Sequence, residues 1–174
     1  MCEGATIQDM RRLIRETLED RGWYGVAIDG NPTWAYTIGL VEECDHPELI
    51  LVGSKLHRAD AVIGELAERV VGGERFDLGR PTVDVGGYAV TFGDVHPRQW
   101  ERSTFAMWVD LYGAEGPPFP EPMALQVIMP PEAYCSDHRN SQPSLADPTV
   151  DITRSPNRFE RRASERNRRR RRRR

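Results

Sequence analysis

The sequence of 174 residues predicts an α+β fold, with about three helices packed on a mixed, largely antiparallel sheet. Three observations support this class. Pairs of short apolar runs flank turn residues, as in hairpins. Other segments have the 3.6-residue apolar period of amphipathic helices. The chain has no regular alternation of strand and helix of the kind that builds a parallel sheet. The predicted order of elements is αβββαββαβ.

The first predicted helix covers about residues 7–20. Thr6 and Asp9 form a capping-box pattern at its start, and Gly22 supplies the permissive residue that a helix end often needs. The positions that follow the helical period are Ile7, Met10, Leu13, Ile14, Thr17 and Leu18.

Three predicted strands follow, over residues 23–28, 34–38 and 48–52. The first two are separated by the turn-forming residues 29–32, which indicates a hairpin. The third is a short, continuous apolar run, and such runs are typical of strands buried on both faces. We therefore expect residues 48–52 at the centre of the sheet.

The second predicted helix begins after Ser54, a candidate N-cap, and ends at Gly72-Gly73. Glu65 and Arg69 have the i,i+4 spacing of a helical ion pair. The apolar stripe consists of Ala59, Val62, Ile63, Leu66, Ala67 and Val70.

A second hairpin is predicted next, with residues 83–85 and 88–92 joined by Gly86-Gly87, which suits a tight primed turn. A third helix is predicted from Pro97 to Gly113. Its periodic positions, Trp100 and Trp108 among them, favour core packing over a wall for an aromatic ligand. A proline-rich link then leads to a last strand over residues 124–129.

The predicted domain organisation is a single α+β domain over residues 1–135, a linker over 136–153 and a disordered Arg-rich tail over 154–174. The tail contains twelve arginines and two glutamates, a net charge of +10. Residues 1–153 contain twelve basic and twenty-five acidic side chains, a net charge of -13. An acidic domain thus carries a strongly cationic tail.

Composition excludes several classes of protein. No apolar run approaches the length needed to span a bilayer, and the first residues lack the pattern of a signal peptide. The odd cysteine count, from Cys2, Cys44 and Cys135, argues against a disulfide framework. We expect a soluble, cytoplasmic protein without membrane partners.

Two motif segments, Trp34-Ala35-Tyr36-Thr37-Ile38-Gly39-Leu40 and His46-Pro47-Glu48-Leu49, resemble a bacterial domain family known as domain of unknown function 4262. The resemblance extends over roughly residues 20–130 and includes Glu68 to Phe76 and the strands at Tyr88-Ala89-Val90 and Leu125-Gln126-Val127. The resemblance implies where the domain begins and ends and where its motifs lie, but it implies no activity.

The polar residues of these motifs are the candidate ligand-binding residues: Tyr36, Thr37, His46, Glu48 and Gln126. A histidine beside a carboxylate can act as a general base or bind a polar ligand. The alternative is structural, with His46-Pro47-Glu48 shaping a turn and the imidazole donating to a backbone carbonyl. No catalytic residue is assigned.

Metal binding is an alternative that we do not favour. Cys44 and His46, together with Cys135 and His138, offer a Cys2His2 set suited to zinc. The spacing is irregular, and two members fall in the predicted linker. We therefore predict free thiols, no metal site and no cofactor.

The sequence leaves three functions open, and whether the protein is an enzyme is undecided. The first is a non-enzymatic acidic binding module that engages a basic or polar partner, such as a basic protein. The second is a small enzyme or small-ligand binder with a pocket at the five candidate residues. The third is weak, non-specific binding of polyanions such as nucleic acid by the tail, through arginines that include Arg161, Arg162, Arg168, Arg169 and Arg170.

Overall fold

The computed structural model describes residues 6–79, 82–101, 103–113, 123–134 and 142–153. The elements are α1 (Ile7–Arg21), β1 (Tyr24–Ile28), β2 (Trp34–Ile38), α2 (Leu40–Cys44), β3 (Glu48–Val52), α3 (Leu56–Val71), β4 (Val83–Val85), β5 (Tyr88–Asp94), α4 (Arg98–Glu101), α5 (Ala106–Tyr112), β6 (Ala124–Ile128) and the 3-10 helix η1 (Pro131–Ala133).

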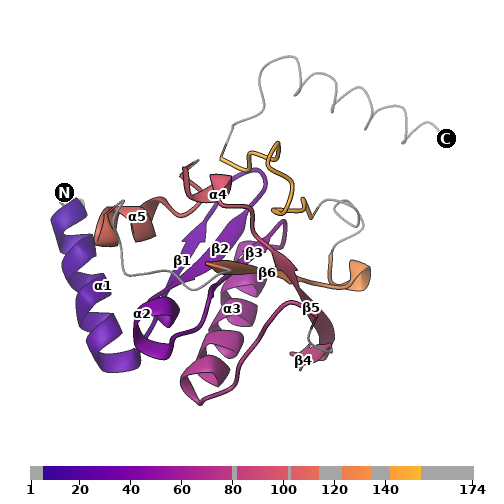
Figure 1. Ribbon diagram of the computed structural model, residues 1–174, viewed down its shortest axis with the longest axis horizontal. Helices are drawn as coiled ribbons and strands as arrows, with labels where there is room; N and C mark the ends of the chain where they lie inside the picture. Colours follow the sequence, from indigo (N-terminus) through magenta and orange to yellow (C-terminus); the bar gives the residue numbers. More distant parts are fainter. Residues whose placement is uncertain (1–5, 80–81, 102, 114–122, 135–141, 154–174) are drawn as a thin grey trace.

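The described strands form a six-stranded mixed sheet in the order β1-β2-β3-β6-β5-β4 (Figure 1). Neighbouring strands are antiparallel, except that β3 and β6 are parallel. The predicted α+β class with a largely antiparallel sheet is therefore confirmed. As predicted, β3 is central and buried along its whole length.

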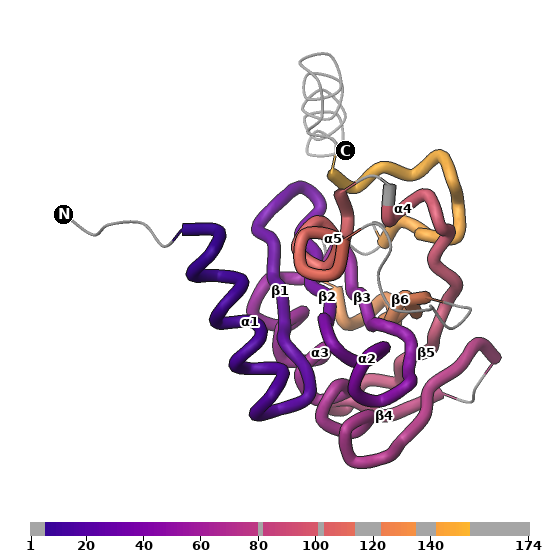
Figure 2. Tube along the Cα trace, turned by 60° about the vertical axis from the view of Figure 1, so that its left-hand side comes forward, coloured from indigo at the N-terminus to yellow at the C-terminus, as the bar shows by residue number. Residues whose placement is uncertain are grey.

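Helices cover both faces of the sheet. In Figure 1, α3 lies below the sheet and α4 and α5 lie above it, and Figure 2 shows α1 along the edge at β1. Leu49 and Leu51 of β3 face the core under α3, whereas Ile50 and Val52 face the core under α5. A strand with apolar residues on both faces belongs between two layers of helices.

Local signals predicted several element ends correctly. Thr6 and Asp9 form the capping box of α1, and Gly22 ends this helix in the left-handed conformation, with φ of 79°. Gly86 and Gly87 have positive φ in the turn between β4 and β5. Each of these signals acts within a few residues, so it does not depend on the rest of the fold.

Two helical predictions need correction. The segment from Pro97 to Gly113 is not one helix but two, α4 and α5, separated by a turn at which Ser103 has φ of 63°. Indole Nε1 of Trp34 donates to the Thr104 carbonyl at 3.1 Å, and the Thr104 hydroxyl donates to Gln99 Oε1 at 3.1 Å. The first bond joins the turn to β2, and the second joins the turn to α4.

Ser54 is not the N-cap of α3. Lys55 occupies that position, and no side chain caps the helix. Gly53, with φ of 82°, turns the chain directly after β3. The helix therefore begins one residue later than the sequence predicted.

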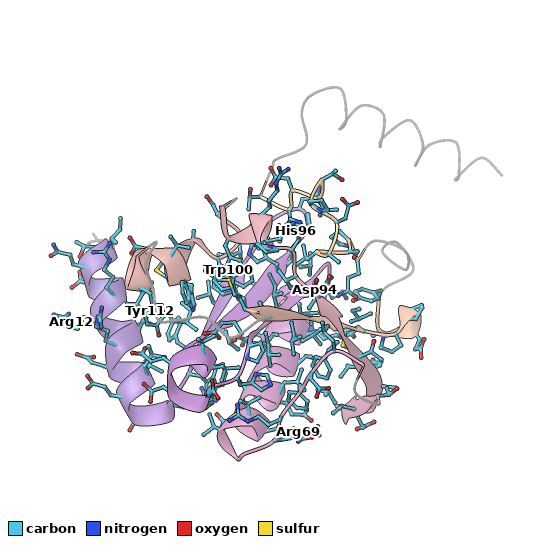
Figure 3. All side chains as sticks on the ribbon, in the orientation of Figure 1. Arg12, Arg69, Asp94, His96, Trp100 and Tyr112 are labelled. Carbon is cyan, nitrogen blue, oxygen red and sulfur yellow. The ribbon has the colours of Figure 1, made fainter. Side chains whose placement is uncertain are left out.

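Residues 142–153, which the sequence analysis assigned to a linker, contribute two side chains to the core. Leu145 is fully buried and Ile152 is 3% exposed, both in the core under α5. Trp100 and Tyr112, both labelled in Figure 3, pack on the same core. The segment 142–153 lacks an apolar period because it is attached by individual buried side chains and not by a helix or a strand.

The described part of the chain contains no helix that is long and apolar enough to cross a membrane.

Candidate functional site

Glu48 lies at the start of β3 and is completely buried. Its Oε2 accepts a hydrogen bond from the Thr37 hydroxyl at 2.6 Å. Its Oε1 accepts from the backbone N–H of Gly39 at 2.9 Å and of Val41 at 3.4 Å, and from indole Nε1 of Trp108 at 3.2 Å. All four partners are donors, which is the arrangement that a carboxylate requires.

This carboxylate caps a helix from a distance. Gly39 is the N-cap residue of α2 and has no side chain to satisfy the first N–H groups of the helix. Glu48, on the strand that follows α2, supplies the missing acceptor at the positive end of the helix. Burial raises the pKa of the Glu48 carboxyl, and its four hydrogen bonds oppose that rise.

His46 connects two loops. Its Nε2 accepts the backbone N–H of Phe76 at 3.0 Å, so Nδ1 carries the proton and donates to the Pro47 carbonyl at 2.6 Å. The ring packs edge-on against the Phe76 ring, with the centroids 5.8 Å apart. The imidazole is 1% exposed, so both ring nitrogens serve contacts inside the protein.

We expect His46→Ala to lower the free energy of unfolding by about 1–3 kcal/mol, because it leaves a buried N–H and a carbonyl without partners. Urea unfolding followed by tryptophan fluorescence measures this loss. His57→Ala is the matched control, because His57 is exposed on α3, and it should change stability by less than about 0.5 kcal/mol. Equal stability of the two variants would contradict the structural role of His46.

Tyr36 and Gln126 attach separate segments to the face under α5. The Tyr36 hydroxyl accepts the Met107 N–H at 3.1 Å, and burial raises the pKa of Tyr36 to about 12. Gln126 donates from Nε2 to the Pro143 carbonyl at 2.7 Å and accepts the Leu145 N–H on Oε1 at 2.8 Å. The side-chain amide of Gln126 thus donates to and accepts from the backbone of residues 142–153.

Of the five candidate ligand-binding residues, the structure brings Thr37 and Glu48 into direct contact. His46, Tyr36 and Gln126 have other partners. Three surface hollows formed by described residues, of about 110, 280 and 470 Å³, are lined by other side chains. Whether the five residues bind a ligand stays a prediction.

Several other predictions fall outside the described residues. Cys135 and His138 of the alternative zinc set do so, as do Cys2 and the tail arginines. Cys44 is a free thiol, and burial raises its pKa. Among the described residues, no group of three His, Cys, Asp or Glu side chains is placed to hold a metal ion.

The sequence analysis did not single out two exposed acidic pairs, which together we call the acidic end: Glu19 with Asp20, and Glu42 with Glu43. These residues lie at the end of α1 and on α2, and all four are exposed. The two helices meet at Gly39, where an added Cβ would lie within 3.1 Å of the Gly22 carbonyl oxygen. None of the four carboxylates forms an ion pair within the described chain. The signal in the sequence was the pair of adjacent acids in each segment.

The model of the family described as Domain of unknown function (DUF4262) matches residues 17–134. This range contains both motif segments, which the Thr37–Glu48 and Gly39–Glu48 hydrogen bonds join in space. No curated protein and no solved structure matches the chain. Because the family model covers more than half of the sequence, the chain belongs to the DUF4262 family of domains of unknown function.

Proposed function

We propose that this protein is a non-enzymatic binding module that engages a basic segment of a partner protein through the acidic end. The observation that carries the proposal is the group of four exposed carboxylates, Glu19, Asp20, Glu42 and Glu43, which have no ion-pair partner in the described chain. Complementary charge speeds encounter and selects the sign of the partner.

The position of two of these carboxylates supports a role in binding. Glu19 and Asp20 lie in the last turn of α1, at the negative end of the helix dipole. Carboxylates there cost the helix about 0.3–1 kcal/mol each in stability. A basic partner would relieve this repulsion on binding, so these residues are better suited to recognition than to stability.

The buried polar groups support a module without catalysis. The carboxylate of Glu48 and both ring nitrogens of His46 hold the fold together through hydrogen bonds to described residues. A general base needs a free lone pair within reach of a substrate. Neither side chain lines any of the three hollows described above.

The test compares two variants of the full chain that change net charge equally. One neutralises the acidic end by Glu19→Gln, Asp20→Asn, Glu42→Gln and Glu43→Gln. The matched control neutralises four exposed carboxylates elsewhere, by the changes Asp29→Asn, Asp60→Asn, Asp77→Asn and Glu132→Gln. Binding of an oligolysine peptide is measured by calorimetry at about 20 and about 200 mM salt, across which screening lengths shorten markedly.

We expect neutralisation of the acidic end to weaken peptide binding about tenfold, or about 1.4 kcal/mol, and the control to weaken it about twofold or less. Wild-type affinity should fall as salt rises, because exposed charges are screened. Equal losses in the two variants would show that net charge alone attracts the peptide, and the proposal would fail.

A further inference from the structure

A small hollow of about 110 Å³ lies beyond the carboxyl ends of the two parallel strands, β3 and β6. One wall is the turn from β3 into α3, which contributes Gly53, Ser54, Lys55 and Arg58. The other wall follows β6 and includes Ala133. The carboxyl ends of parallel strands are a common place for ligands, because the loops there diverge and leave a crevice.

Ser54 is the buried polar residue of the turn that forms this wall. The residue is 6% exposed and lines the hollow, but its hydroxyl forms no hydrogen bond with the described residues. It does not cap α3, because Lys55 occupies the N-cap position. The hydroxyl is therefore available to a hydrogen-bond acceptor bound in the hollow.

Two cationic side chains flank this hydroxyl. Lys55 is exposed and forms no ion pair within the described chain. Arg58 is held at the hollow because its Nη1 donates to the Ala133 carbonyl and its guanidinium lies 5.6 Å from the centre of the Tyr88 ring. Arg58 retains further N–H donors. Lys55 and Arg58 thus place two positive charges without ion-pair partners in the described chain on a domain whose residues 1–153 have a net charge of -13.

The start of α3 adds a third kind of donor. This helix has sixteen residues, and no side chain caps its first N–H groups. Those groups and the helix dipole favour an anion at this end. Gly53 has φ of 82° and donates its N–H to the Thr33 carbonyl at 2.7 Å, which fixes the turn that presents Ser54 and Lys55.

We propose that this hollow binds a phosphate group, held by the Ser54 hydroxyl, the Lys55 and Arg58 side chains and the N-terminus of α3. A hydroxyl, two cations and backbone N–H groups are the donors that a phosphate uses. The hollow lies at the opposite end of β3 from α2, so it is separate from the acidic end. The phosphate group belongs either to the free ion or to a monoester on a small metabolite.

The test is a titration of the full chain with inorganic phosphate and, separately, with glycerol 3-phosphate, at constant ionic strength. Backbone N–H signals are followed by NMR, which separates residues 53–58 from the cationic tail. We expect saturable shifts concentrated at Ser54, Lys55 and the first residues of α3. Saturation by both ligands indicates a site for the phosphate group itself, whereas saturation by glycerol 3-phosphate alone indicates a monoester site.

Variants decide whether these groups form the site. Lys55→Glu should weaken binding at least about tenfold, while Arg98→Glu, which changes net charge equally at another exposed position, should weaken it about twofold or less. Ser54→Ala should weaken it several-fold and keep the fold, as circular dichroism checks. Absence of saturable shifts at 53–58 with both ligands, or equal effects of Lys55→Glu and Arg98→Glu, would overturn the proposal.

Discussion

Replacing Glu48 by alanine should lower the free energy of unfolding by about 3–5 kcal/mol, among the largest losses for a single side chain in this domain. The change leaves the Thr37 hydroxyl, the Gly39 N–H and the Trp108 indole N–H without their acceptor in a fully buried site. It also removes the cap of α2. Urea unfolding followed by tryptophan fluorescence measures the loss.

Two further variants test whether this loss comes from the hydrogen bonds of the Glu48 carboxylate. Glu48→Gln retains one oxygen for the N–H donors but sets an amide group against the Thr37 hydroxyl, so we expect an intermediate loss of about 1–2 kcal/mol. Glu43→Ala removes an exposed glutamate from α2 and should cost less than about 0.5 kcal/mol. Wild-type stability of Glu48→Ala would refute the capping role of this carboxylate.

The same residue predicts a pH dependence. Burial raises the folded-state pKa of Glu48 above its ordinary value of 4.5. The folded protein therefore holds this proton more tightly than the unfolded chain, and stability from this group falls as the pH rises through the folded-state pKa. The stability advantage of wild type over Glu48→Gln should be largest below the ordinary pKa and should narrow as the pH rises. If the difference in unfolding free energy between wild type and Glu48→Gln widened as the pH rises, the hydrogen bonds would outweigh burial in setting the pKa of Glu48.

Gly39→Ala is the second change with a large expected effect. Gly39 has φ of 107°, a region that side chains rarely adopt, and an added Cβ would overlap Cδ2 of Leu18 on α1. Backbone strain and overpacking together should cost about 3–5 kcal/mol. The melting temperature and the urea midpoint should both fall.

Two controls separate strain from overlap. Gly73→Ala imposes a similar strain, with φ of 94°, but its Cβ would have no neighbour within 4 Å, so it should cost about 1–2 kcal/mol. A double variant with Leu18→Ala should cost less than the sum of the two single changes, because the smaller side chain makes room. Additive losses would contradict the contact between α1 and Gly39.

The sequence by itself determined the elements whose signals are local. The apolar stripe of α3, the doubly buried run of β3, the capping box at Thr6 and the Gly86-Gly87 turn all appear as predicted. In each case the deciding interactions lie within one helical turn, one strand or one tight turn. The family resemblance also came from contiguous residues.

Only the tertiary structure decided the features that depend on partners far apart in the chain. α2 forms where the sequence indicated no element, because Glu48 caps it from the next strand. The break between α4 and α5 depends on Trp34, and the packing of residues 142–153 depends on Gln126. Likewise, Ser54 faces a hollow because the segment after β6 closes over the turn into α3. Hydrogen-bond donors and acceptors that meet only after folding leave no periodic pattern in a sequence. Apolar periodicity and helix-capping residues therefore do not reveal them.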